Sequence, residues 1–335
     1  MLYFYHGADY MQRNAFLLIE LINRINQNKI SDEQIVILGA SMGGQVARWA
    51  LNYMEHNNLD HCVRLFCSFD SPWKGAHIPL SLQSFIKYMS EDANKAVAKQ
   101  RLKDLRWPAT RQMLLYHIDA CDANYATKTK FGKKKWNVSY NFPNQLTFAT
   151  DSLFDQFYQE AEDLGDFPKA CRNVAMVNGN SQGIREFNDG QRYLHSNKTC
   201  WGLKNKVVLY AEGASNNIIS ELNTGGIFKE VWEKRFKTFN SQKLDNCPGG
   251  YRGDFLEIQE SLKKFLTDNY CPHTPSLDYN RSTFIPVASA LALENDDWNY
   301  QLGQKIGPNS SFLRGLTKFE SYHAPLRNEP HVLVS

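Results

Sequence analysis

The residue with the clearest chemical potential is Ser41, at the centre of Gly39-Ala40-Ser41-Met42-Gly43. A bare Gly-x-Ser-x-Gly pattern occurs often by chance. Here an apolar run at residues 35–38 precedes the pattern and a helical pattern follows it, as in the nucleophile elbow of a serine hydrolase. An elbow turns from strand to helix within a few residues and holds its serine in a strained backbone conformation. The sequence therefore predicts that Ser41 is a catalytic nucleophile.

Two glycines and one backbone amide complete this hypothesis. Residues two positions either side of the serine come too close to the turn for a Cβ atom, so the positions of Gly39 and Gly43 are expected to require a small residue. The following helix points its positive dipole end, about half a unit charge, toward the serine. The Met42 N–H is the expected first donor to an oxyanion. This chemistry calls for no cofactor and no metal ion.

Short apolar runs that alternate with helical periods predict an α/β fold, with a mostly parallel sheet flanked by helices. Strands are expected at residues 2–5, 35–38 and 63–69, and helices at 10–27 and 43–56. The run 35–38 is apolar throughout, which is typical of a strand buried on both faces. Residues 80–118 carry helical patterns, and residues 128–150 are irregular and polar. We therefore interpret 80–150 as an inserted, mainly helical cap within a single α/β-hydrolase domain, 1–335.

The sheet is expected to resume after this cap. The sequence favours a helix at 152–164, a strand at 173–177, hairpins across 193–239 and a helix at 254–267. Six apolar side chains of the cap could line a pocket for an acyl chain, or could simply pack the cap: Phe85, Ile86, Trp107, Leu114, Leu115 and Tyr116.

Composition excludes several classes of protein. The chain has 335 residues, 42% of them hydrophobic and 22% charged, which predicts a globular protein with a large core. The net charge of +3 is spread along the chain apart from Lys133-Lys134-Lys135, so nothing indicates nucleic acid binding. No apolar run approaches the roughly 20 residues that span a bilayer, and the N-terminus lacks a signal-peptide pattern. Location and oligomeric state stay open.

The cysteines suggest neither a zinc ribbon nor a thioredoxin-like site, because none of the seven forms a CxxC pair. Cys67 lies in an apolar run and is expected to be a small buried hydrophobe. Four cysteines lie in turn-rich sequence, where disulfides are possible: Cys171, Cys200, Cys247 and Cys271.

Beyond the elbow, the sequence resembles a group of bacterial lipase-like α/β-hydrolases. The similar segments are Gly7-Ala8-Asp9-Tyr10, Gly39 to Arg48, Ser71-Pro72-Trp73-Lys74-Gly75, Asp245-Asn246-Cys247-Pro248-Gly249-Gly250, Phe284-Ile285-Pro286 and Asn328-Glu329-Pro330-His331. The wider relatives of the group are the glycosylphosphatidylinositol inositol-deacylases and the lecithin:cholesterol acyltransferase-like lipases. The resemblance implies an α/β-hydrolase fold and a serine esterase or lipase-like activity on a small-molecule or lipid ester.

The same resemblance bears on the ends of the chain. The similar proteins carry Gly-Ala-Asp-Tyr-type sequence after a later strand than the first. The front of the domain, with the loop that carries a second oxyanion donor, is therefore expected to be missing. The stretch after His331 also lacks a closing helix, so the chain is expected to be incomplete at both ends.

A serine nucleophile needs a general base, which comes last in the order Ser, acid, His of this fold. Only His323 and His331 lie in the last stretch of the chain. Asn-Glu-Pro-His resembles the motif that ends the catalytic region of the similar group, so His331 is the expected base and His323 the alternative. The seven earlier histidines are expected to be exposed or structural: His6, His56, His61, His77, His117, His195 and His273.

Three aspartates are candidates for the acid that orients the base. Asp70 directly follows a parallel strand, at the edge of the sheet where catalytic groups gather, and is the preferred one. Asp278 precedes a segment that resembles the acid-bearing loop of the acyltransferase-like lipases. Asp189 lies in a polar turn after the resumed strand.

Three functions remain open at this stage. The favoured one is a serine esterase or lipase that works through an acyl-enzyme on Ser41, with His331 as base. The second is a non-catalytic binding protein on a hydrolase scaffold. The third is a peptidase or polyester depolymerase with the same triad.

Overall fold

The computed structural model describes the chain over the following residues: 2–130, 133–141, 148–178, 188–225, 233–251, 254–268, 271–293, 298, 322–323 and 331–334.

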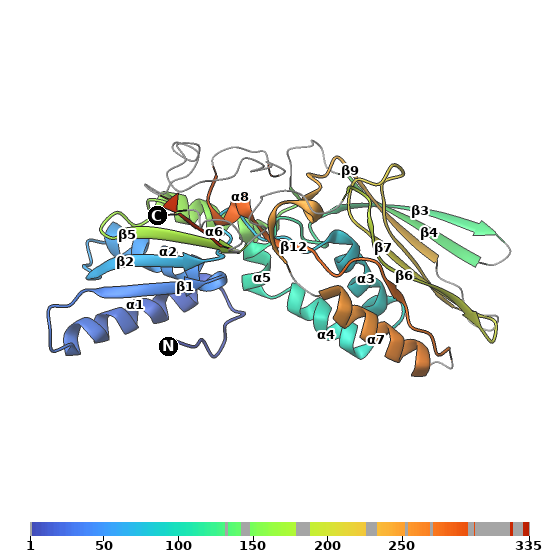
Figure 1. Ribbon diagram of the computed structural model, residues 1–335, viewed down its shortest axis with the longest axis horizontal. Helices are drawn as coiled ribbons and strands as arrows, with labels where there is room; N and C mark the ends of the chain where they lie inside the picture. Colours follow the sequence, from blue (N-terminus) through green and yellow to red (C-terminus); the bar gives the residue numbers. More distant parts are fainter. Residues whose placement is uncertain are drawn as a thin grey trace.

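The site lies on a five-stranded sheet with the strand order β1-β2-β5-β14-β13 (Figure 1). Its strands are β1 (Ile35–Ala40), β2 (Val63–Phe69), β5 (Arg172–Asn178), β14 (His331–Val334) and β13 (Tyr322–His323). The first three run parallel, whereas β14 pairs antiparallel with β5 and with β13. The predicted α/β class is confirmed, and so are the strands predicted from residues 35, 63 and 173.

Three helices lie beside this sheet, as the apolar periods predict. They are α1 (Met11–Asn28), α2 (Met42–His56) and α6 (Ser152–Asp163). Helix α2 packs on β1 and β2, and α1 and α6 pack on α2. Ala15 and Ile22 of α1 and Val46 and Ala50 of α2 are buried, which puts the apolar stripe of each helix into one core.

Two predictions about the first strands are wrong. Residues 2–5 form no strand, and Tyr3 and Tyr5 are 83% and 88% exposed. Strand β1 is an edge of its sheet and is buried on one face only, since Val36 and Leu38 are 46% and 67% exposed. An apolar run marks a strand but does not show how many of its faces are covered.

A second, seven-stranded sheet has the order β11-β6-β7-β8-β9-β4-β3. Its strands are β3 (Asp122–Lys130), β4 (Lys133–Asn141), β6 (Arg192–Cys200), β7 (Leu203–Tyr210), β8 (Ile218–Gly225), β9 (Glu233–Phe239) and β11 (Ser276–Leu277). All neighbours pair antiparallel except β4 and β9. The hairpins predicted across 193–239 are confirmed.

Helices lie along one side of this second sheet (Figure 1). They are α3 (Leu80–Glu91), α4 (Ala96–Leu105) and α7 (Asp254–Asp268), and α5 (Pro108–Met113) leads back toward α6. Helix α3 packs on β7 and β8, and the Ser84 hydroxyl lies 2.7 Å from that of Ser220. Tyr193 of β6 stacks on Phe255 of α7 with ring centroids 4.2 Å apart.

Residues 128–130 and 133–141, which were expected to be irregular, belong to strands. Here β3 and β4 form a hairpin at one edge of the second sheet. Val138 and Tyr140 are 1% and 2% exposed, whereas Asn137 and Ser139, which alternate with them, are half-buried. This period of two is the pattern of a strand with one covered face, and the polar residues on the other face hid it from the sequence analysis.

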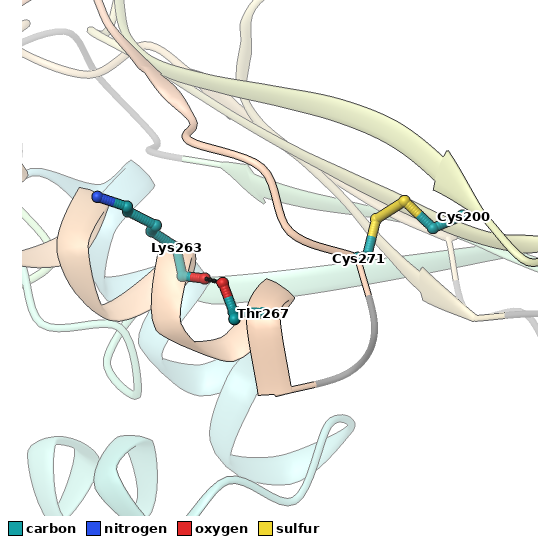
Figure 2. The surroundings of a disulfide bond; sticks show 4 residues. All are labelled: Cys200, Lys263, Thr267 and Cys271. Atoms are coloured by element: carbon teal, nitrogen blue, oxygen red, sulfur yellow. Dashed lines mark hydrogen bonds between the residues drawn. A yellow bond between two sulfur atoms is a disulfide. The ribbon is translucent and has the colours of Figure 1, made fainter.

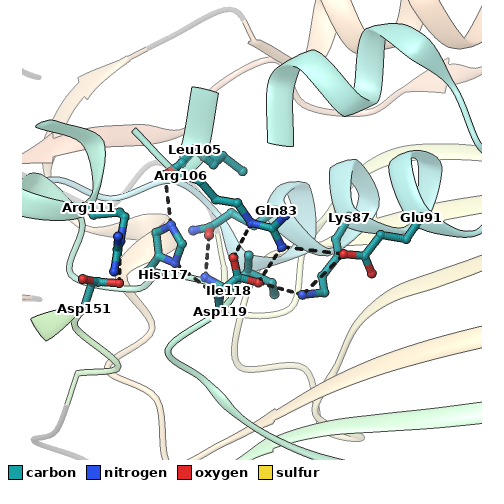
Figure 3. Close-up of polar contacts among 10 residues, drawn as sticks. All are labelled: Gln83, Lys87, Glu91, Leu105, Arg106, Arg111, His117, Ile118, Asp119 and Asp151. Carbon is teal, nitrogen blue, oxygen red and sulfur yellow. Dashed lines mark hydrogen bonds and ion pairs between the residues drawn. The ribbon is translucent and has the colours of Figure 1, made fainter. Parts of the chain in front are cut away.

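Most of the apolar cap residues considered for an acyl pocket are buried. Phe85, Leu114, Leu115 and Tyr116 are buried in the core, while Trp107 is 38% exposed. A polar network joins the cap elements as well (Figure 3): the Asp119 carboxylate accepts hydrogen bonds from Arg106 and Lys87 at 2.6 and 2.7 Å.

The remaining elements close the gap between the two sheets. They are the 3-10 helix η1 (Leu244–Asn246), the pair β10 (Gly249–Tyr251) and β12 (Thr283–Pro286), and α8 (Val287–Ala290). A disulfide joins Cys200 to Cys271, two of the four cysteines considered for disulfides (Figure 2). Cys171 and Cys247 are thiols, and Cys67 is half-buried rather than buried. Among the described residues, no helix combines the length and apolarity that a bilayer crossing requires.

Candidate active site

Ser41 is the single residue between strand β1 and helix α2. Its backbone has φ 50° and ψ −123°, in the left-handed half of φ space that side chains with a Cβ rarely adopt. Its N–H donates to the Phe69 carbonyl at 2.7 Å, which ties the turn to the end of β2. Such a conformation costs on the order of 1–3 kcal/mol and persists only where its surroundings impose it. The predicted strand–turn–helix is therefore present, with its strain at the serine.

Close packing around the turn explains one of the two predicted glycines. A Cβ on Gly39 would lie 2.7 Å from the Gly43 carbonyl and from the backbone of Gly44. A Cβ on Gly43 would meet nothing within 4 Å, so the prediction that Gly43 must be small is wrong. The tight position is Gly44, where a Cβ would lie 2.0 Å from the Ser71 hydroxyl oxygen. The first turn of α2 presses on the segment after β2, and Gly44 is the residue at that contact.

The helix end beside Ser41 carries an uncompensated positive dipole. The first turn of α2 has no acidic residue, and the Ser41 side chain makes no capping hydrogen bond to it. The Met42 and Gly43 N–H groups begin the helix and have no acceptor within it, whereas the Gly44 N–H donates to the Ser41 carbonyl at 3.0 Å. An anion that forms at Ser41 would therefore meet the positive end of α2.

Asp70 occupies the equivalent position on the neighbouring strand. Ala40 pairs with Phe69 in the parallel register, so Ser41 and Asp70 are the next residues on two adjacent strands. Asp70 also has a φ of 50°, and its N–H donates to the Met176 carbonyl at 2.7 Å. The adjacency of the two strand ends agrees with the sequence analysis, although β1 runs to Ala40 rather than to residue 38.

His331 begins strand β14, where it pairs with Asn178 at the end of β5. Its backbone therefore lies at the same sheet edge as Ser41 and Asp70, with β2 and β5 between it and β1. At about 4.8 Å per strand, this separates the His331 and Ser41 backbones by roughly 14 Å. His323 lies on β13, one strand farther out. The side chains of both histidines lie outside the described residues. A separation of this size exceeds the combined reach of a serine and a histidine side chain, so contact between His331 and Ser41 stays a prediction that requires His331 to come closer to Ser41.

The two other candidate acids have partners away from this edge. Asp278 follows β11 in the second sheet and forms an ion pair with Arg192, while its N–H donates to the Tyr193 carbonyl. Asp189 accepts from Lys243 at 3.1 Å and from the Asn246 amide at 3.4 Å. Of the three aspartates, Asp70 alone is placed on the strand next to Ser41.

Two polar side chains of α2 hold the segment after Asp70 in place. The buried Gln45 amide donates to the Pro72 carbonyl and, at 3.0 Å, to the Tyr158 hydroxyl. The Tyr158 hydroxyl donates to the same carbonyl at 2.6 Å. The buried Arg48 lies over the Trp73 ring at 5.3 Å. Helix α2 thus fixes the chain that leaves Asp70, which fixes Asp70 relative to Ser41.

The charged guanidinium of Arg48 is buried. Burial lowers the pKa of its guanidinium, and Asp166 opposes this shift across a contact of 3.4 Å. Rings of Trp73, Tyr158 and Phe167 surround the cation. Cation–π contacts and one carboxylate thus replace its water.

The sequence analysis missed Gln45 and Arg48 as positioning residues. Both follow the serine motif directly, in Gly44-Gln45-Val46-Ala47-Arg48, and the buried Asn52 continues the same helix face. Polar residues on the buried face of a helix were the available signal, because such groups need partners.

Comparison with known proteins identifies the N-terminal part of the chain. The comparisons with curated proteins and with solved structures gave no match. The family model of the PGAP1-like alpha/beta domain matches residues 2–150, which include β1, Ser41, α2, β2 and Asp70. This match confirms the resemblance to the inositol-deacylase group of α/β-hydrolases. Over residues 2–150 this chain is therefore similar to the PGAP1-like alpha/beta domain.

Proposed function

We propose that this protein is a serine hydrolase that cleaves carboxylic esters through an acyl-enzyme on Ser41. One observation carries the proposal: Ser41 stands alone between a parallel strand and a helix, at φ 50°, with the positive end of α2 beside it. In a serine hydrolase, such a strained turn from strand to helix presents the hydroxyl of the nucleophile at the edge of the sheet.

In the proposed reaction, the Ser41 hydroxyl oxygen attacks the ester carbonyl carbon while its proton passes to His331. The Met42 N–H donates to the oxyanion of the tetrahedral intermediate. His331 returns the proton to the leaving alcohol as the bond from carbonyl carbon to alcohol oxygen breaks. Water then attacks the acyl-enzyme and gives a proton to His331, which passes it to the Ser41 oxygen as the bond from acyl carbon to that oxygen breaks and the acid leaves.

Asp70 is the proposed acid that orients His331. Its backbone lies on the strand next to Ser41 and on the His331 side of it, in the order β1, β2, β5, β14. A carboxylate there fixes the tautomer of the base and stabilises the imidazolium that forms during attack. This role is distinct from that of Gln45, which acts on the chain after Asp70 and touches no reacting atom.

A fluorophosphonate probe on the 335-residue chain tests the nucleophile. We expect covalent labelling of the wild type at Ser41, identified by peptide mass spectrometry, and none in Ser41→Ala. The matched control is Ser68→Ala, because Ser68 is a buried serine of the adjacent strand β2 that donates to the Val174 carbonyl. Labelling that persists in Ser41→Ala would mean that another residue reacts with the probe and would contradict the proposal. A wild type that never labels would contradict it as well and would favour the binding scaffold.

Hydrolysis of p-nitrophenyl esters with acyl chains from acetyl to dodecanoyl tests the substrate class. We expect ester cleavage that Ser41→Ala abolishes. Cleavage of a peptide amide with no cleavage of any ester would contradict an esterase and indicate a peptidase instead. The proposed substrate is a small-molecule or lipid ester.

The Cys200–Cys271 disulfide supports a proposal about location. Disulfides persist in oxidising compartments and are rare in reducing ones, so we propose that the protein works outside the cytosol, in a secreted or cell-surface setting. Thiol counting on the denatured protein, as purified from its native source, should give five reactive thiols without reductant, for Cys62, Cys67, Cys121, Cys171 and Cys247. Seven thiols would contradict this proposal.

A further inference from the structure

Three ionisable side chains meet in the interior between the two sheets, away from Ser41. His77 lies between β2 and α3, Glu212 follows β7, and Asp245 belongs to η1. All three side chains are fully buried. One potential ligand atom from each lies within 4.8 Å of the other two.

The hydrogen bonds of this group leave two polar atoms unsatisfied. His77 Nε2 lies 2.7 Å from Asp245 Oδ1, and Asp245 Oδ2 accepts the Glu212 N–H at 2.7 Å. Glu212 Oε2 accepts the Leu244 N–H at 3.1 Å. His77 Nδ1 and Glu212 Oε1 have no hydrogen-bond partner among the described residues. A buried polar atom without a partner costs on the order of 1–3 kcal/mol, so two in one cluster point to a missing ligand.

We propose that His77, Glu212 and Asp245 bind a structural divalent metal ion, with Zn²⁺ as the best-fitting chemistry. An imidazole nitrogen and carboxylate oxygens are ordinary zinc ligands at about 2.0–2.2 Å from the metal. Ligand atoms around such an ion lie about 3–4 Å apart, which the observed limit of 4.8 Å permits with small side-chain rotations. The inference does not rest on the proposed esterase activity.

Charge balance favours the cation. Two carboxylates and one imidazole lie together in a fully buried site, where uncompensated negative charge is strongly unfavourable. A divalent ion would neutralise both carboxylates.

The position of the ligands gives the ion a structural role. His77 belongs to the segment that follows the Asp70 strand, and its N–H donates to the Phe284 carbonyl of β12 at 2.7 Å. Glu212 follows strand β7 of the second sheet, and Asp245 lies in η1, after strand β9 of the same sheet. The metal ion would therefore join the part of the chain that carries Ser41 to the seven-stranded sheet.

Zn²⁺ and Co²⁺ alone serve as probes in the test. We expect metal analysis of the purified 335-residue chain, or titration after chelator treatment, to give about one equivalent of Zn²⁺ per chain. Co²⁺ should give visible absorption bands without a thiolate charge-transfer band, and Zn²⁺ should remove them.

Variants locate the site. His77→Ala and Glu212→Gln should weaken binding at least about tenfold. His61→Ala should leave it unchanged, since His61 is equally buried and faces a single carboxylate, Glu55, at 3.1 Å. Circular dichroism checks folding. If His77→Ala does not fold, Glu212→Gln decides, because it preserves the shape of a protonated glutamate. A wild type that binds neither ion, or a Glu212→Gln protein that binds as tightly as the wild type, overturns the proposal.

Discussion

The sheet edge at Ser41 and the buried cluster at Asp245 both gather polar side chains, but they are built in opposite ways. Ser41 and Asp70 are half-buried and both have a φ of 50°, so the strain is in the backbone. His77, Glu212 and Asp245 are fully buried and none has a positive φ, so the cost is in unsatisfied atoms and buried charge.

This difference bears on what each region can do. Strain at a partly exposed serine holds a reactive group where a substrate can reach it. Unpaired atoms in a closed interior cannot meet a substrate and are satisfied by a proton or an ion. We therefore assign chemistry to the Ser41 edge and cohesion between the two sheets to the cluster. The predictions below test this assignment.

The largest effect is expected from Asp70→Asn. Loss of the orienting carboxylate should lower kcat for ester hydrolysis by about 10⁴-fold, because the base then holds the wrong tautomer. Binding of Zn²⁺ should not change. The matched control is Asp278→Asn, which removes a carboxylate paired with Arg192 in the second sheet and should leave kcat unchanged. A large loss with Asp278→Asn and none with Asp70→Asn would reverse the choice of acid.

Removal of the Cys200–Cys271 disulfide should affect stability but not the serine. The bond joins the end of β6, a strand of the seven-stranded sheet, to the segment after α7, across 71 residues of sequence (Figure 2). Cys200→Ala with Cys271→Ala should lower the free energy of unfolding by about 2–4 kcal/mol in urea titrations.

Fluorophosphonate labelling of the folded double variant should match the wild type. The control is Cys62→Ala, which replaces a half-buried thiol near β2 and leaves the disulfide intact. A double variant that folds but no longer labels would mean that the part of the chain around the seven-stranded sheet shapes the serine site directly.

Most of the Ser41 edge could be predicted from the sequence because its determinants are local. The strand, the serine and the helix are contiguous, and Asp70 follows the next strand, so the parallel-sheet rule brings the two together. The cluster gives no such signal. More than a hundred residues separate His77 from Glu212, and 33 separate Glu212 from Asp245. Only the path of the second sheet brings the three together.

The same argument explains the errors. Whether residues 2–5 form a strand, and whether both faces of β1 are buried, depends on which other parts of the chain pack against them. A run of apolar residues does not encode this. Gly43 and Gly44 are adjacent in the motif, and only the approach of Ser71 shows which one is constrained. The hairpin of β3 and β4 was hidden because its polar face dominates the composition.

The elbow itself can be tested with two glycines. Gly39→Ala should lower the free energy of unfolding by about 1–3 kcal/mol and slow labelling, because its Cβ would lie 2.7 Å from backbone atoms of Gly43 and Gly44. Gly43→Ala is the matched control. Its Cβ meets open space, so stability should stay level or rise by up to about 1 kcal/mol. Equal losses from both would show that the strained turn is not packed as described.

The smallest effect is expected at Asp119, in the polar network of the cap (Figure 3). Burial raises the pKa of its carboxyl, but hydrogen bonds from Arg106 and Lys87 outweigh burial and lower it below the usual 3.8. A lowered pKa means that the folded state favours the charged form. The resulting stability is present above that usual value and is lost as the pH falls through it toward the folded-state pKa.

Urea titrations of wild type and Asp119→Asn from about pH 6 to about pH 3 measure this contribution. We expect a difference below about 1 kcal/mol near neutrality, because the carboxylate is 30% exposed and solvent screens its ion pairs. The difference should shrink at the acid end and with added salt. Asp163→Asn, an exposed position on α6 next to Gln159, controls for the change in net charge. A difference that grows toward low pH would mean that Asp119 is held in its protonated form, and would remove the ion pairs from the description of the cap.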